Sequence, residues 1–137
     1  MNFILLDNLF SVVEISPEEK YALVKAKGTY IPVEEFKRCF ISLGDYIKEN
    51  QNIEKLIFDK RNLNVFDQDS MVWYFVEWKA EMARYGLTIH RKLLPEDDVF
   101  QESVKLGREK LARENPDAAF HKLDIQYAKS IEEAVDH

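Results

Sequence analysis

The sequence predicts an α/β domain built around a mixed sheet, and three observations support this class. Short runs rich in β-branched and aromatic residues alternate with longer stretches whose apolar residues recur every three or four positions. Because parallel strands need a crossover helix, this alternation indicates mostly parallel strands. With 46% hydrophobic residues, four glycines and four prolines, the chain has the composition of a globular protein. No repeat or linker divides its 137 residues, so we expect a single domain over residues 1–137.

The N-terminal part predicts an antiparallel hairpin followed by a helix. Phe10–Ile15 and Tyr21–Lys27 are rich in strand-forming residues, and Ser16–Glu19 between them carries turn residues. Pro32 then opens an amphipathic stretch, so residues Thr29–Glu49 are expected to contain the first helix.

The middle of the chain predicts a central strand and a second helix. Lys55–Asp59 is almost continuously apolar, which is typical of a strand covered on both faces. Asp69 or Ser70 can cap a helix that runs to Tyr85. Gly86 follows in the position where a left-handed residue closes a helix.

The C-terminal part predicts further β-α units. Leu87–Leu94 is expected to be a strand, and Asp97 or Asp98 can cap a third helix after it. Ala118–Leu123 is predicted as a short last strand. Ser130 begins a Ser-x-x-Glu sequence that favours a brief closing helix.

Several segments together resemble a known family. They are Gly28 before the first helix, the strand Leu56-Ile57-Phe58-Asp59 followed by Arg61, the aromatic helix Trp73–Trp78, and the closing Ser130–Ala134. With the predicted topology, they resemble the SpoIIAA-like group of STAS-related domains. The resemblance implies an N-terminal hairpin followed by β-α units with helices mainly on one side, no metal, no cofactor and no established enzymatic activity. It also implies protein–protein regulation, or binding of a lipid-like or small apolar molecule near a membrane.

The same resemblance makes Ser70 a candidate regulatory residue. Members that act as anti-sigma-factor antagonists carry an Asp-Ser-small-Gly sequence at the start of the second helix, where the serine is phosphorylated. Asp69-Ser70 matches the first two positions, but Met71 follows and the glycine is absent. A phosphorylation switch at Ser70, acting through a surface or a dimer interface, is the alternative function that the resemblance implies.

The second helix carries a wide apolar arc that predicts a binding site. Trp73, Phe75, Trp78 and the flexible Met82 are expected to line a pocket for an apolar ligand between the second helix, the third helix and the sheet. These side chains could equally fill the core between helix and sheet, or form a homodimer interface.

Arg61 is the predicted polar end of this site. It follows the central strand, at the edge where open α/β sheets place ligands, and it could bind a carboxylate or phosphate head group. The alternative is a structural ion pair between Arg61 and Asp59.

Other patterns argue against several functions. A net charge of −6 disfavours nucleic acid as a partner. The three histidines are widely spaced, and His90 beside Arg91 and Lys92 is expected to form a polar strand surface rather than a metal site. The single cysteine, Cys39, has no nucleophile motif around it and is expected to be a half-buried packing residue.

These observations predict a non-enzymatic binding or regulatory module. No nucleophile with its base and no metal or cofactor site can be assigned from spacing. Expected partners are a small apolar ligand, a protein partner or a second copy, and a peripheral membrane contact through Val99 and Phe100. A cytoplasmic location is expected because one cysteine cannot form an internal disulfide and the apolar run at the N-terminus is short.

Overall fold

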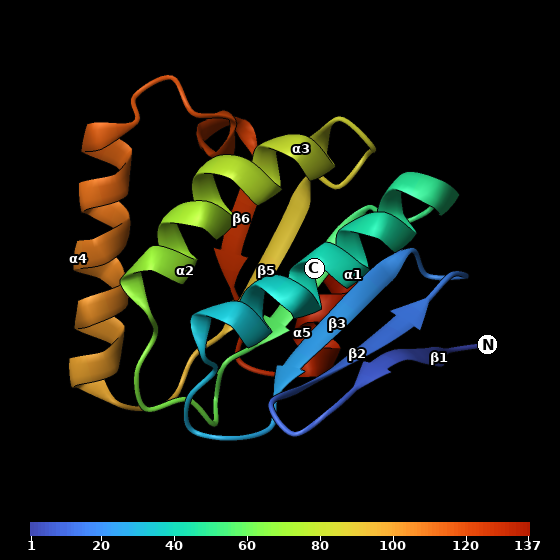
Figure 1. Cartoon of the computed structure of the whole chain (residues 1–137), viewed down its shortest axis with the longest axis horizontal. Helices are drawn as coiled ribbons and strands as arrows, with labels where there is room; N and C mark the ends of the chain where they lie inside the picture. The colour runs from blue at the N-terminus through green and yellow to red at the C-terminus, as the bar shows by residue number, and fades with distance from the viewer.

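Six strands form one mixed sheet in the computed structural model, which describes residues 1–137. The strands lie side by side in sequence order, as Figure 1 shows. The first three pair antiparallel and the last four pair parallel. The α/β class with an antiparallel N-terminal part is therefore confirmed. The strands are β1 (Phe3–Asp7), β2 (Ser11–Ser16), β3 (Tyr21–Ala26), β4 (Lys55–Asp59), β5 (Ile89–Leu93) and β6 (Asp124–Tyr127).

The helices cover the two faces of the sheet unequally (Figure 1). Most of them lie across one face, whereas the short C-terminal helix lies behind the sheet and contacts β4 and β5. The helical elements are α1 (Val33–Asn50), α2 (Gln68–Val72), η1 (Trp73–Trp78), α3 (Lys79–Ala83), α4 (Asp98–Glu114), η2 (Ala119–Lys122) and α5 (Ile131–Asp136). Of these, α2, η1 and α3 follow one another without a break, and η1 is a π-helical turn within this continuous helix.

Side chains along β4 point alternately to the two faces of the sheet, and each face has its own hydrophobic core. Leu56 and Phe58 point towards the large helical layer, where Phe40 of α1 is buried with them, whereas Ile57 points towards Ala134 of α5. Most of the apolar burial, and therefore most of the stability, lies between α1, the continuous helix and the sheet. Cys39 also lies on the inner face of α1 and is buried there, not half-buried as predicted.

The helix α4 lies beside the continuous helix at one end of the molecule (Figure 1). Asp97 caps it, because its Oδ1 accepts hydrogen bonds from the backbone N–H groups of Val99 and Phe100 at 2.9 and 3.3 Å. A Cβ at Gly107 would lie 3.2 Å from the Met71 sulfur, so the glycine permits close packing of α4 against α2. The predicted cap at Asp97 is confirmed.

The predicted last strand is wrong. Within Ala118–Leu123, residues Ala119–Lys122 form a 3₁₀ turn, and the strand begins only at Asp124. The physical reason is that Phe120 is buried against Phe75, with ring centroids 5.6 Å apart. This contact directs the segment into the helical layer before the chain joins the sheet.

Two further boundaries differ from the prediction. A strand precedes the expected hairpin, because β1 pairs with β2 along the edge of the sheet. The second helix is capped by Asp67, whose Oδ1 accepts the Ser70 N–H at 2.9 Å, so neither Asp69 nor Ser70 is the cap. In contrast, Gly86 does adopt a positive φ of 101° where the helix ends, as expected.

Candidate functional site

A large cleft lies at the carboxyl ends of the parallel strands. Its volume is about 1310 Å³. One wall consists of residues just after β4, β5 and β6, and the other is formed by α4. The lining residues are Arg61, Leu93, Leu94, Pro95, Glu96, Asp98, Gln101, Glu102, Lys105, Arg108, Glu109, Ala112, Tyr127, Ala128 and Lys129. This edge is the one where open α/β sheets place their ligands.

Arg61 forms the predicted ion pair with Asp59 and also lines the cleft. Its Nε and Nη2 donate to the two carboxylate oxygens of Asp59 at 3.0 and 2.9 Å. Burial alone would raise the pKa of Asp59, but these hydrogen bonds hold it below the usual value. The Arg61 side chain is still 45% exposed and borders the cleft. The ion pair therefore fixes a guanidinium at the wall of the cleft.

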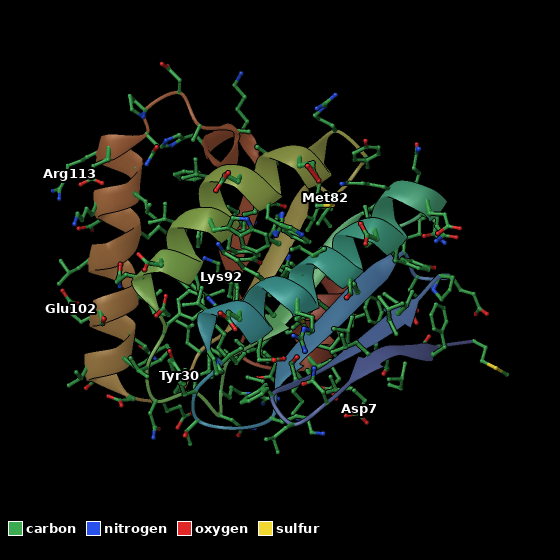
Figure 2. The ribbon with its side chains drawn as sticks, viewed as in Figure 1. Asp7, Tyr30, Met82, Lys92, Glu102 and Arg113 are labelled. Carbon is green, nitrogen blue, oxygen red and sulfur yellow. The ribbon has the colours of Figure 1, made fainter.

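Three lysine side chains are buried in the layer between the helices and the sheet. Lys60 follows β4, Lys92 belongs to β5, and Lys79 begins α3. Their relative exposure is 0, 1 and 0%. None of the three ammonium nitrogens has a hydrogen-bond partner. Figure 2 labels Lys92 at the helical layer, where its side chain meets Phe75 of η1. We call Lys60, Lys79 and Lys92 the lysine cluster.

Aromatic rings hold the lysine cluster in place. The Nζ atoms of Lys79 and Lys92 lie 3.9 and 4.1 Å from the centroid of the Phe75 ring. Lys60 Nζ lies 4.2 Å from the centroid of Phe66. Such contacts attract an ammonium group to the ring face, but they replace only part of the hydration lost on burial.

The electrostatic surroundings of the lysine cluster are positive. Burial, and secondly the guanidinium of Arg108, lower the pKa of Lys60 from 10.5 to about 7. Burial, together with the other cluster members and Arg108, also holds the pKa values of Lys79 and Lys92 well below the usual lysine value. The three amines therefore lose their protons more readily than exposed lysines do.

The predicted polar surface on β5 is wrong, because His90, Arg91 and Lys92 are all buried. His90 lies on the same face of β5 as Lys92, and neither of its ring nitrogens has a partner. Burial, followed by the charges of Lys79, Lys92 and Arg91, lowers its pKa far below the usual value. Arg91 points the other way, where its Nη2 donates to Asp124 Oδ2 at 3.0 Å and to the His137 carbonyl at 2.9 Å.

The structure separates the predicted site residues into two places. Trp73, Trp78 and Met82 border a smaller hollow of about 240 Å³ beside α1. Within this group only Trp73 is partly exposed, while Trp78 and Met82 are 4 and 1% exposed. Phe75 is fully buried and contacts the lysine cluster instead. Arg61 lies at the large cleft, which shares no lining residue with this hollow.

Three other predicted residues differ in their exposure. Ser70 is 1% exposed, and its hydroxyl has no hydrogen-bond partner. Of the two residues expected to touch a membrane, Val99 is 79% exposed and Phe100 is buried.

The lysine cluster and Arg108 were not among the predicted site residues, although a signal for them exists in the sequence. Lys79 follows Phe75 by four positions and precedes Met82 by three, so it lies in phase with the apolar stripe. Lys60 likewise follows Phe58 by two positions and shares its side of the strand. A lysine in phase with buried neighbours is the signal that points to this site.

Comparison with known proteins identifies no relative: no family model, curated protein or solved structure matches the chain. No group of three or more histidine, cysteine or acidic side chains is arranged to hold a metal ion. None of the helices combines the length and apolar character needed to cross a membrane.

Proposed function

We propose that this protein is a non-enzymatic binding module of the kind that the SpoIIAA-like resemblance implies. Its ligand is a small amphiphilic molecule held in the cleft between α4 and the sheet, beside the continuous helix. The observation that carries this proposal is the cleft itself, about 1310 Å³ in volume at the carboxyl ends of β4, β5 and β6.

The lining of the cleft supports a ligand with an apolar body and an acidic group. Leu94 and Tyr127 offer apolar surface, and Arg61 and Arg108 offer guanidinium groups that suit a carboxylate or phosphate. Four acidic side chains also line the cleft, so an anionic group is expected to bind at the guanidinium groups; these are Glu96, Asp98, Glu102 and Glu109. The cleft exceeds the roughly 300–1,000 Å³ typical of small-molecule sites, so a chain of several methylene groups fits it. The apolar ligand expected from the sequence is therefore proposed with an acidic end.

No observation favours the Ser70 switch over this function. Its hydroxyl is buried under the helical layer, so a kinase reaches it only if α2 moves away from the core. Phosphorylation of Ser70 remains an untested prediction.

Native mass spectrometry of the freshly purified protein tests whether a ligand is retained. We expect an additional mass that disappears on denaturation.

Filling the cleft is expected to abolish binding of an amphiphilic anion. Ala112 lies on α4 and lines the cleft, so Ala112→Trp places an indole in the ligand volume. We expect dodecanoate titrated into this variant to bind at least about tenfold more weakly than to the unmodified protein, by isothermal titration calorimetry.

The matched control is Leu106→Trp, since Leu106 lies on the same helix, is 55% exposed and does not line the cleft. This variant should bind dodecanoate as the unmodified protein does. Equal affinity in both tryptophan variants would exclude the cleft as the binding site.

A further inference from the structure

The nitrogens of the lysine cluster have no hydrogen-bond partner, although buried ammonium groups need one. Lysine side chains are rarely fully buried without a partner, because removing their charge from water is costly. Here three such side chains share one region, each at most 1% exposed and each with an unpartnered nitrogen. Every charged group that acts on Lys60, Lys79 and Lys92 is itself positive. Burial in these surroundings therefore favours the neutral amines, whereas a bound anion would favour the ammonium forms.

The four cationic groups come from four different elements and face the same region. Lys60 follows β4, Lys92 extends from β5, Lys79 extends from the first turn of α3, and Arg108 belongs to α4. Lys79 and Lys92 approach the same Phe75 ring, one from the helical layer and one from the sheet. Arg108 acts electrostatically on all three lysines.

Arg108 also connects the lysine cluster to the cleft, because it is one of the residues that line it. None of the three lysines lines the cleft itself, so the link between the lysine cluster and the cleft runs through Arg108.

We propose that Lys60, Lys79, Lys92 and Arg108 bind a phosphate-type dianion, which is the head group of the ligand held in the cleft. This inference rests on the proposed function only for the position of the apolar part. Several cationic donors with no carboxylate among them suit a doubly charged, tetrahedral group better than a singly charged carboxylate. The same chemistry is offered by free phosphate and by the phosphate of an amphiphile.

Binding of such a dianion is coupled to proton uptake. The anion stabilises the ammonium forms, so it raises the lowered pKa values of the lysines and draws protons from solution. A phosphate monoester is already doubly charged above about pH 7. Affinity should therefore fall as pH rises from 7 to 9, because protonating the lysines from solution becomes more costly while the phosphate keeps its charge. His90, another buried basic group, also faces Lys79 and Lys92 and adds no negative charge.

Isothermal titration calorimetry with inorganic phosphate and with dodecyl phosphate tests the proposal. We expect both to bind, with proton uptake measured by comparing buffers of different ionisation enthalpy. Lys92→Met should weaken binding of both by about tenfold to a hundredfold, since it removes one charged donor. Lys110→Met is the control, because Lys110 is exposed on α4 and lies outside both the cleft and the cluster. Circular dichroism confirms that each variant is folded.

The outcomes separate the two proposals. Tighter binding of dodecyl phosphate than of inorganic phosphate would identify the head group of an amphiphile, whereas equal binding would identify free phosphate. If dodecanoate binds in the cleft but neither phosphate binds, the lysine cluster is no anion site and the proposed function stands. If Lys92→Met and Lys110→Met bind phosphate equally well, the inference is overturned whatever the affinity.

Discussion

Replacing Lys60 with methionine is expected to raise the free energy of unfolding by about 4 kcal/mol at pH 7 in a buffer without phosphate. In the folded chain the pKa of Lys60 is about 7, whereas the unfolded side chain has a value near 10.5. Because the unfolded state holds the proton more tightly, it is favoured at neutral pH. Methionine has a similar length and no charge, so it fills the same position without this penalty.

The pH dependence of this effect has a defined sign. The destabilisation caused by Lys60 is full below pH 7 and disappears as pH rises towards 10.5. The advantage of Lys60→Met over the unmodified protein should therefore shrink steadily between pH 7 and 10, as measured by urea unfolding. The exposed Lys110→Met variant should show no such trend. A Lys60→Met protein that is less stable than the parent would show that this ammonium already has a stabilising partner.

Replacing Phe40 with alanine is expected to lower the free energy of unfolding by about 3–5 kcal/mol. Phe40 is 1% exposed and lies at the centre of the aromatic core, where its ring centroid is 4.8 Å from that of Tyr74 and 5.0 Å from that of Trp78. Its backbone carbonyl also accepts a hydrogen bond from Trp78 Nε1 at 2.7 Å. Removing the ring leaves a cavity where α1 meets the continuous helix.

Urea unfolding measures this loss. Phe3→Ala provides the same change of side chain at a position that is 39% exposed on β1, and it should cost well under half as much. Equal losses in the two variants would mean that the interface between α1 and the continuous helix contributes little to stability.

The sequence pattern predicted the helices of the large core well because their burial follows a helical period. The apolar residues of the first helix recur at steps of three and four, and α1 occupies Val33–Asn50, close to the predicted range Thr29–Glu49. The cap at Asp97 and the closing Gly86 depend only on local backbone chemistry, so they too were predictable.

The remaining elements depend on contacts between distant segments. In the edge strand β1, the apolar residues Phe3 and Ile4 are exposed. Its sequence therefore lacks the alternation of buried apolar and exposed polar residues that would predict a strand. The 3₁₀ turn before β6 is held by the contact of Phe120 with Phe75, which lies far away in the chain. No local pattern could place these contacts.

The lysine cluster was missed for a related reason. A lysine in a strand, such as Lys92, is ordinarily exposed, and only the position of α3 and Lys79 above it shows that water is excluded. The prediction placed Phe75 in the same pocket as Trp78 and Met82. The sequence of one helix shows which residues are apolar, but it does not show which of them pack against α1 and which against the sheet.

The single thiol of Cys39 provides an internal reporter of motion in the core. It is buried between α1 and the sheet, and burial raises its pKa to about 11, so in the native state it is shielded from reagents and protonated. Alkylation therefore requires a transient separation of α1 from the strands. With one cysteine in the chain, the rate of labelling by iodoacetamide reports the equilibrium population of that open state. A ligand that stabilises the helical layer would slow this reaction, so binding can be followed without any attached dye.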